Sequence, residues 1–493
     1  MNLKQLLTNL EYELLQGDIE VKVSDIVYDS RKATKDNAFV CLSGAVVDGH
    51  SYIESAFELG CRVIFVEKDV DLIDGVTYIK LKDTRKALSY LSQALFDYPA
   101  KKLTTIALTG TKGKTTTAFM IKEILENAGK KVGVIGTMGV FIGERHIETK
   151  NTTPESYDIQ YYLNEMVKEN IEYAIMEVSS QALKVGRTEG LEFDYAIFTN
   201  LSPDHIGGAE HKDMDEYIYC KSLLFKQCRH GVFNIDDECY GNMTKNASCT
   251  LNTFGFSQNA DIRVKNVEYM VEGGFIGIDF ITEGTVNDEF KVNTPGKFTA
   301  YNALSAIALS RLLGIDITNI KNALYNFAVR GRVEPVNISD RFTLLIDYAH
   351  NAVSMESILT TIREYNPKRI VSMFGCGGNR SKNRRYEMGE ISGKLADLTV
   401  ITEDNSRFED VMDIIEDIKI GIHKTDGEYV VVPNRKDAIR YCIENAEDGD
   451  IILLLGKGHE DYQEINGERF PFDERVIINE IMKEIGEKNG TDN

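Results

Sequence analysis

Short apolar runs alternate with amphipathic helical stretches over the last third of the chain. Strands joined by crossover helices pair in parallel, so this alternation predicts a parallel sheet covered by helices. Each run is followed by polar or glycine residues, and ligands bind beyond the carboxyl ends of such strands. The five runs are Phe342–Ile346, Arg369–Phe374, Leu398–Ile401, Tyr429–Val432 and Ile451–Leu455.

The first part of the chain has the same alternation on a smaller scale. Ala38–Leu42 and Arg62–Val66 are typical of buried strands, and Tyr52–Leu59 is typical of a helix that Gly60 ends. The polar stretch that begins at Tyr98-Pro99 is expected to be a linker. A length of 493 residues suggests two to four domains, and the segments along the chain indicate three, at residues 1–99, 100–331 and 332–493.

A phosphate-binding loop is predicted near residue 110. The apolar run Thr105–Leu108 leads into Gly110-Thr-Lys-Gly-Lys-Thr115, and helix-forming residues follow from Ala118. Glycines let backbone amides surround a polyphosphate, the lysine supplies positive charge, and the hydroxyl can bind Mg²⁺. The general pattern has a glycine where Leu108 stands, so this variant predicts a nucleoside triphosphate without specifying an activity.

Three further residues are candidates for chemistry. The apolar run 172–177 ends in Glu177, an acid of the kind that helps to hold Mg²⁺ beside a phosphate loop, although a structural glutamate fits the pattern too. A second run, 195–200, leads to His205, a candidate ligand. Lys221 shares a helical face with apolar residues; that pattern alone favours a surface lysine whose stem packs on them.

Composition excludes several classes of protein. Asp and Glu number 77 against 56 Lys and Arg, so the net charge of −21 repels nucleic acid and anionic lipid. No apolar run approaches the roughly 20 residues that span a bilayer, and the chain opens with no signal or transit peptide. We expect a cytoplasmic protein without membrane insertion. The eight cysteines form no Cys-x-x-Cys motif, which argues against a zinc site.

Four motifs together resemble the Mur ligases, the ATP-dependent amide-forming enzymes of peptidoglycan synthesis. They are Thr109-Gly-Thr-Lys-Gly-Lys-Thr-Thr116, Glu177-Val-Ser-Ser180, Asn200-Leu-Ser-Pro-Asp-His205 and Lys221-Ser-Leu-Leu-Phe225. Further motifs resemble the family member that adds the third amino acid. These are Asp29-Ser30-Arg31, Asp48-Gly49-His50, the loop 151–154, and the segments 375–385 and 456–463.

The resemblance implies a fold and a reaction. The fold would be α/β with three domains: a uridine-nucleotide domain, a central phosphate-loop ATPase domain with a mainly parallel sheet, and a C-terminal Rossmann-like domain that binds the amino acid. ATP would phosphorylate the D-glutamate carboxylate of UDP-N-acetylmuramoyl-L-alanyl-D-glutamate. The amine of a diamino acid would then attack the acyl phosphate. The product serves cell-wall biogenesis, and through it cell shape and division; a monomer is expected.

The resemblance also assigns residues to three binding sites. ATP would contact Gly110, Thr111, Lys112, Gly113, Lys114, Thr115, Thr116, Asn302, Arg332, Asp347 and His350. The uridine substrate would contact Ser30, Asn151, Thr152, Thr153, Ser179 and Arg187. The amino acid would contact Arg385, Asp404, Asn405, Ser406, Arg407, Gly456 and Glu460.

The resemblance also implies which residues are catalytic. Lys114 would stabilise charge on the transferring phosphoryl group. Thr115 and Glu177 would hold one Mg²⁺. His205 and a carbamylated Lys221 would hold a second. Addition of carbon dioxide to the neutral lysine amine replaces a cation with an oxygen anion, which is a ligand suited to Mg²⁺.

The sequence departs from the family pattern at a few places. The stretch from Asp204 to Lys221 is two residues longer than in many members, which leaves the role of His211 open. Thr299 stands where asparagine is common, and Ser406 replaces the proline of Asp-Asn-Pro-Arg. That motif accompanies meso-diaminopimelate, whose distal carboxylate and ammonium suit Arg407 and an acid. We therefore expect meso-diaminopimelate, with L-lysine or another diamino acid as the alternative.

Three other kinds of protein could share parts of this sequence pattern. A folylpolyglutamate synthetase would share the ATP site but lack the uridine-domain motifs. A non-catalytic nucleotide-binding paralogue would be expected to lose a ligand, yet Lys114, Thr115, Glu177, His205 and Lys221 are all present. A GTPase would require Asn-Lys-x-Asp, which does not occur.

Overall fold

The computed structural model describes residues 1–493 apart from 45–46, 204–205, 208–209, 273–274 and 492–493. The chain forms two compact units. The first contains Met1–Arg263 and Tyr301–Ile320, and the second contains Val264–Ala300 and Lys321–Asn493.

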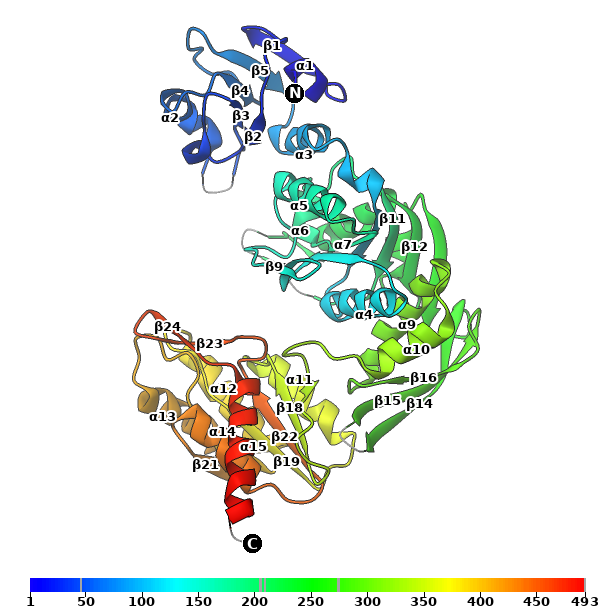
Figure 1. The fold of residues 1–493 in the computed structure, drawn as a ribbon, viewed down its shortest axis with the longest axis vertical. Coiled ribbons are helices and arrows are strands. Elements are labelled where there is room, and N and C mark those ends of the chain that lie inside the picture. The colour runs from blue at the N-terminus through cyan, green and yellow to red at the C-terminus, as the bar shows by residue number, and fades with distance from the viewer. Residues whose placement is uncertain (45–46, 204–205, 208–209, 273–274, 492–493) are drawn as a thin grey trace. The chain divides into compact units, whose positions relative to one another are not determined.

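The first unit begins with a small five-stranded sheet (Figure 1). Its strand order is β1 (Tyr12–Gln16), β5 (Thr77–Leu81), β4 (Val63–Val66), β3 (Asn37–Val40) and β2 (Asp25–Val27). Only β1 is antiparallel to its neighbour. The helices are α1 (Leu3–Leu6), α2 (Ile53–Glu58) and α3 (Thr84–Leu95). The strands predicted at 38–42 and 62–66 and the helix at 52–59 are confirmed, within one or two residues at each end.

The same unit holds a larger sheet around the predicted phosphate loop. Its order is β13 (Thr250–Gly255), β12 (Cys228–Asn234), β11 (Phe193–Phe198), β6 (Thr104–Thr109), β10 (Tyr173–Glu177), β7 (Val132–Gly136), β8 (Gly139–Ile142) and β9 (Arg145–Ile147). The strands from β13 to β7 are parallel, and β8 and β9 are antiparallel additions. The mainly parallel central sheet is thereby confirmed.

Helices connect these strands: α4 (Lys114–Asn127), α5 (Ser156–Lys168), α6 (Ser180–Lys184), α7 (Met214–Ser222) and α8 (Tyr240–Thr244). The helix α9 (Lys297–Leu312) comes later in the chain, and its first four residues belong to the second unit. The predicted linker after Tyr98 forms a short 3₁₀ turn, Pro99–Lys102, between α3 and β6.

The second unit begins with antiparallel β15 (Phe275–Gly284) and β16 (Glu289–Val292), beside β14 (Ile262–Glu272), and includes most of α10 (Ile317–Tyr325). A six-stranded sheet follows, in the order β17 (Glu334–Pro335), β18 (Thr343–Asp347), β22 (Asp450–Leu455), β19 (Arg369–Phe374), β20 (Leu398–Ile401) and β21 (Tyr429–Val431). All five predicted strands are present and parallel.

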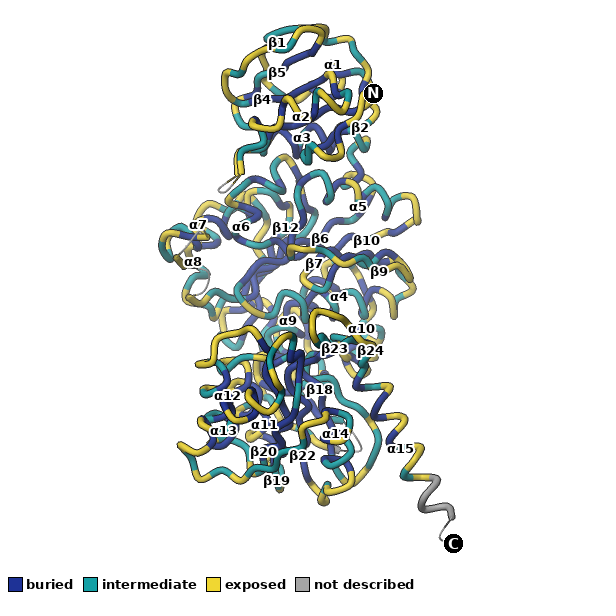
Figure 2. Tube along the Cα trace, turned by 90° about the vertical axis from the view of Figure 1, so that its left-hand side faces the viewer, coloured by how far each residue is buried: buried dark blue, intermediate teal, exposed yellow. Residues whose placement is uncertain are grey.

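Helices lie between the parallel strands of this sheet in the chain: α11 (Ala352–Arg363), α12 (Lys382–Leu395), α13 (Val411–Ile422) and α14 (Arg435–Glu444). A further helix, α15 (Glu474–Thr491), comes after the last strand. The strands β18 and β22 are buried along their whole length, as Figure 2 shows in dark blue. A hairpin, β23 (Tyr462–Ile465) with β24 (Glu468–Pro471), follows β22 and was not predicted. Among the described residues, no helix is long and apolar enough to cross a bilayer.

Candidate active site

The glycine-rich loop lies between β6 and α4, where the sequence predicts a phosphate site. The helix α4 begins at Lys114, four residues before the helix formers that mark it in the sequence. Gly113 has a φ of +85° and caps the helix, and a Cβ there would lie 2.4 Å from Oδ1 of Asn302. Only glycine fits this position, and the N–H groups of a first helical turn can bind an anion.

Two lysine ammonium groups converge on one backbone carbonyl of this loop. Lys114 Nζ donates to Gly110 O at 2.8 Å, and Lys221 Nζ donates to the same oxygen at 2.9 Å. Lys221 is 2% exposed on α7 and lies 4.7 Å from the centre of the Tyr217 ring. The interpretation of Lys221 as a surface lysine, which the pattern alone favours, is therefore wrong.

Glu177 ends β10 beside the loop and is fully buried. Its Oε2 accepts hydrogen bonds from Thr115 Oγ1 at 3.0 Å and from Thr137 Oγ1 at 3.1 Å, and its Oε1 accepts one from Thr137 N at 3.1 Å. The parallel register sets Glu177 opposite Leu108 at the carboxyl end of β6. A carboxylate and a hydroxyl are thus held together at the start of α4, and both are hard oxygen ligands.

Two candidate histidines follow β11 in the chain. His205 lies outside the described residues. His211, whose role the sequence left open, is 1% exposed, and its Nε2 lies 2.9 Å from Ser180 Oγ at the start of α6. Burial lowers the pKa of His211 from its ordinary value, with nearby Lys184 adding to the effect. The neutral imidazole is therefore favoured.

The other predicted ATP residues lie in both units. Thr117 Oγ1 donates to Asn302 Oδ1 at 3.4 Å, which places Asn302 beside the loop. In the second unit, Asp347 is the last residue of β18 and accepts hydrogen bonds from the N–H groups of Val333 and Ala349 at 2.7 and 2.8 Å. Burial raises the pKa of Asp347. Within that unit, Arg332 lies over the ring of Tyr348 and His350 Nδ1 lies 2.8 Å from the carbonyl of Tyr348.

Most residues predicted for the uridine substrate lie together in the first unit. Arg187 Nη1 donates to Thr153 O at 2.9 Å, and Ser179 N donates to Thr153 Oγ1 at 3.0 Å. Thr152 Oγ1 lies 3.1 Å from Thr137 Oγ1, which also contacts Glu177. The loop 151–153 is therefore linked to the glutamate beside the phosphate loop.

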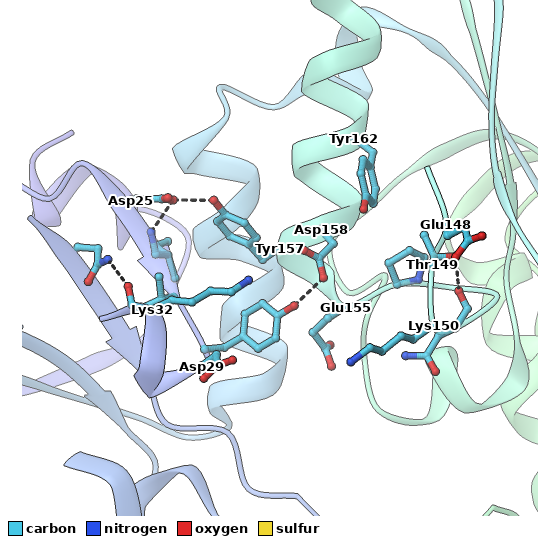
Figure 3. Close-up of a pocket in the computed structure, with 16 residues that line it drawn as sticks. Asp25, Asp29, Lys32, Glu148, Thr149, Lys150, Glu155, Tyr157, Asp158 and Tyr162 are labelled. Atoms are coloured by element: carbon cyan, nitrogen blue, oxygen red, sulfur yellow. Dashed lines mark hydrogen bonds between the residues drawn. The ribbon is translucent and has the colours of Figure 1, made fainter. Parts of the chain in front are cut away.

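Two cavities adjoin this group. One, of about 690 Å³, is lined by Asn151 and by the side chains in Figure 3. The figure shows acids and lysines from the small sheet on one side and from α5 and its preceding loop on the other. The second, of about 650 Å³, is lined by Ser30 and neighbours in the small sheet's domain. Ser30 and Asn151 thus line different cavities.

Most of the residues predicted for the amino acid meet at the carboxyl ends of β20 and β22. Asn405 Nδ2 donates to Glu460 Oε2 at 2.9 Å. Gly456 has a φ of +110°, and a Cβ there would lie 2.7 Å from Asp404 Oδ2, so glycine is required. Sequence reasoning missed Lys457, which is fully buried and donates to Asn405 Oδ1 at 3.1 Å and to Tyr462 O at 2.7 Å. Its position directly after a buried strand was the available signal.

The two predicted arginines have partners already. Arg407 Nε donates to Glu464 Oε2 at 3.2 Å and its Nη1 donates to Gly378 O at 2.8 Å. Glu409, two positions after Arg407 in the chain, pairs with Arg385 instead. Arg385 is 1% exposed and donates to Glu409 at 2.8 Å and to Asp417 at 2.9 Å.

The fold and the glycine-rich loop identify the chain as an α/β protein with a phosphate-binding loop. Three sequence profiles then match successive parts of the chain. They are "Mur ligase family, catalytic domain" at residues 22–95, "Mur ligase middle domain" at 108–310, and "Mur ligase, glutamate ligase domain" at 331–458.

Relatives match over nearly the whole chain. A protein of Clostridium acetobutylicum named UDP-N-acetylmuramoyl-L-alanyl-D-glutamate--2,6-diaminopimelate ligase 1 is 40% identical over 98% of this chain and 100% of its own length. A Clostridium botulinum protein named as the corresponding ligase is also 40% identical, with the same coverage. A solved structure titled as such a ligase aligns with a TM-score of 0.76 and 25% identity over 99% of both chains. The chain therefore belongs to the Mur ligase family, whose members are ATP-dependent ligases.

A likeness of the fold extends further. A folylpolyglutamate synthase of Mycobacterium tuberculosis, solved with ADP and AMPPCP, aligns over 75% of this chain and 92% of its own, with a TM-score of 0.57 and 15% identity. Such a likeness concerns the fold alone. The relatives named above match the first segment of the chain as well, so the full-length comparison favours the Mur ligases over the folylpolyglutamate synthetases.

Proposed function

We propose that this protein ligates meso-2,6-diaminopimelate to the D-glutamate carboxylate of UDP-N-acetylmuramoyl-L-alanyl-D-glutamate, with ATP as the energy source, in peptidoglycan biosynthesis. The observation that carries the proposal is the 40% identity, over nearly the whole length of both chains, to relatives that are named for this ligation. The phosphate loop with its buried glutamate and two convergent lysines supports an active enzyme rather than a non-catalytic paralogue.

The loop residues would bind and orient ATP. The amides from Gly110 to Thr116 surround the phosphates, and Lys114 moves its ammonium from the Gly110 carbonyl to the transferring phosphoryl group. Asn302 lies beside the loop, and Arg332, Asp347 and His350 of the second unit complete the proposed set. The D-glutamate carboxylate accepts the γ-phosphoryl group and ADP leaves; the amine of the amino acid then attacks the acyl phosphate, forming the amide and releasing phosphate.

The donors at the loop fit Mg²⁺. Thr115 and Thr137 surround the buried Glu177 carboxylate with hydroxyl groups, so the hard oxygens needed for this cation are already oriented. We infer that Thr115 and Glu177 hold Mg²⁺. When bound, the cation would neutralise charge on the phosphates.

The convergence of two ammonium groups supports a carbamate on Lys221. Two cations that share the Gly110 carbonyl repel each other, and conversion of the Lys221 amine into a carbamate would remove that repulsion. The neutral amine adds to carbon dioxide; a C–N bond forms, one N–H proton goes to solvent, and an anionic carbamate results. That anion would attract Lys114 and, with His205, would offer oxygen and nitrogen ligands to a second Mg²⁺.

The substrates would occupy the two remaining groups of residues. Ser30, Asn151, Thr152, Thr153, Ser179 and Arg187 would hold the uridine substrate, and Arg385, Asp404, Asn405, Ser406, Arg407, Gly456 and Glu460 the diamino acid. Arg407 would grip the distal carboxylate of diaminopimelate, which L-lysine lacks, while the buried Arg385 would act by fixing Glu409 and Asp417.

The remaining proposals concern organisation and location. We infer three domains, 1–99, 100–331 and 332–493, because the three matched profiles fall within or close to those bounds. We also infer a monomer in the cytoplasm, where the nucleotide substrates are found, with a role in cell shape and division through the cell wall.

Phosphate release tests the proposal directly. The purified protein is assayed with ATP, Mg²⁺, the UDP-dipeptide, and either meso-diaminopimelate or L-lysine. We expect release that requires both the UDP-dipeptide and meso-diaminopimelate. Release that depends on L-lysine in preference would overturn the choice of amino acid, and release without either substrate would overturn the ligase.

A further inference from the structure

Arg435 is the first residue of α14 and is fully buried, although it plays no part in the reaction described above. Its guanidinium uses all three nitrogens. Nη2 donates to Leu455 O at 2.9 Å, Nη1 donates to Glu403 O at 3.2 Å, and Nε donates to Glu474 Oε1 at 2.9 Å. One rigid side chain therefore joins the ends of two strands to the start of α15.

The two carbonyls have a particular place in the chain. Leu455 directly precedes Gly456, and Glu403 directly precedes Asp404. Gly456 and Asp404 both belong to the proposed amino-acid site, and they approach so closely that a Cβ on Gly456 would lie 2.7 Å from Asp404 Oδ2. A small shift of either strand end would therefore change the distance between Gly456 and Asp404.

We propose that Arg435 is a positioning residue that sets the spacing of the two strand ends forming the amino-acid site, an inference that rests on the proposed function. By fixing the Glu403 and Leu455 carbonyls at once, Arg435 fixes the backbone from which Asp404 and Gly456 project. The ATP loop of the first unit contains none of these residues.

The geometry explains why arginine stands here. A planar guanidinium presents donors in fixed directions, whereas a lysine ammonium on a flexible stem acts as a point charge. Glu474 is also fully buried, and its Oε2 has no hydrogen-bond partner among the described residues. The carboxylate is thus held by Arg435 through Oε1, and it orients the guanidinium in return.

A second arginine of the same sheet provides a matched control. Arg369 begins β19 and donates through Nε and Nη2 to the buried Asp450, at 3.2 and 2.6 Å. This pair lies at the amino ends of β19 and β22, the opposite edge from Arg435. Arg369→Lys therefore disrupts a comparable set of guanidinium hydrogen bonds without touching the strand ends of the proposed site.

The experiment compares steady-state kinetics of Arg435→Lys, Glu474→Gln and Arg369→Lys with those of the wild type. For Arg435→Lys we expect the KM for meso-diaminopimelate to rise about tenfold or more, with the KM values for ATP and the UDP-dipeptide within about twofold. Glu474→Gln should raise the same KM by a smaller factor, because the guanidinium keeps its carbonyls but loses the charge that orients it. Arg369→Lys should lower the melting temperature and leave all three KM values unchanged.

Several outcomes would overturn the inference. An unchanged KM for diaminopimelate in Arg435→Lys, an equal rise in all three KM values, or the same selective rise in Arg369→Lys would each do so. If Arg435→Lys does not fold, Glu474→Gln decides by the same criterion. A wild type that shows no diaminopimelate-dependent phosphate release would instead overturn the proposed function, and this inference with it.

Discussion

The Tyr28 hydroxyl donates a 2.6 Å hydrogen bond to Oδ2 of Asp158, 130 positions further along the chain. A second tyrosine–aspartate bond runs in the opposite direction: Tyr157 on α5 donates to Oδ1 of Asp25 on β2 at 2.7 Å (Figure 3). The small sheet and α5 are thus joined by a reciprocal pair of tyrosine–aspartate bonds. These bonds lie beside Ser30 and the loop 151–153, which we propose to bind the uridine substrate.

Tyr28→Phe is expected to weaken this junction. The change leaves the half-buried Asp158 carboxylate without the phenol, and loss of such a bond to a charged group costs about 1.5–3 kcal/mol. We expect a lower melting temperature and a higher KM for the UDP-dipeptide, with the KM for ATP unchanged. Tyr12→Phe, at an exposed position of β1 in the same small sheet, is the control. Equal kinetics in the two variants would contradict the expectation.

The C-terminal sheet could be predicted because its strands are buried on both faces and appear in the sequence as continuous apolar runs. The strand β17 could not, because a pair of residues, Glu334 and Pro335, carries no pattern. The burial of Lys221 was equally inaccessible, since it depends on the Gly110 carbonyl 111 positions away. The partner of Arg407, Glu464, comes from an unpredicted hairpin 57 positions later. The local sequence pattern indicates helices and strands, whereas the partner of a charged side chain depends on residues that are distant in the sequence.

Lys221→Ala is expected to abolish ligation nearly completely. The change removes the amine that we propose to be carbamylated, so added bicarbonate should have no effect, while acetate or formate should restore part of the activity by supplying oxygen ligands. Lys212→Ala, which changes an exposed lysine close by in the chain, should leave turnover unchanged. Near-normal turnover of Lys221→Ala at limiting bicarbonate would exclude the carbamate.

Glu177→Gln is expected to reduce kcat by at least about a hundredfold at ordinary Mg²⁺ concentration. The amide keeps the shape of the side chain and one acceptor for Thr115, but it loses the negative charge. A titration of activity against Mg²⁺ measures the effect: the variant should require a higher concentration, and a chelator should stop both enzymes. An unchanged Mg²⁺ dependence would remove Glu177 from the proposed metal ligands.

His211 should make stability depend on pH. Because burial lowers its folded pKa below the ordinary value of 6.5, the unfolded chain binds the proton more readily. The stabilisation is present above pH 6.5 and is lost as the pH falls through that value toward the lowered folded pKa. His211→Gln removes the titrating group and keeps a donor for Ser180. Unfolding midpoints at pH 7.5 and 5.5 should differ less in the variant than in the wild type, and an identical difference would contradict this assignment.

The choice of amino acid depends on Arg407, whose backbone has a φ of +52° and whose guanidinium is shared between Glu464 and the Gly378 carbonyl. A planar fork can bind a carboxylate through two parallel hydrogen bonds, and lysine cannot reproduce that geometry. Arg407→Lys should therefore raise the KM for meso-diaminopimelate about tenfold or more and leave the KM for ATP unchanged. Glu464→Gln provides the opposite test: it removes a competing carboxylate, so the KM for diaminopimelate should fall or stay constant. Kinetic assays of both variants with meso-diaminopimelate and L-lysine measure the effect, and a loss of discrimination between the two amino acids is expected only in Arg407→Lys. If Arg407→Lys discriminates as well as the wild type, the distal carboxylate is bound elsewhere.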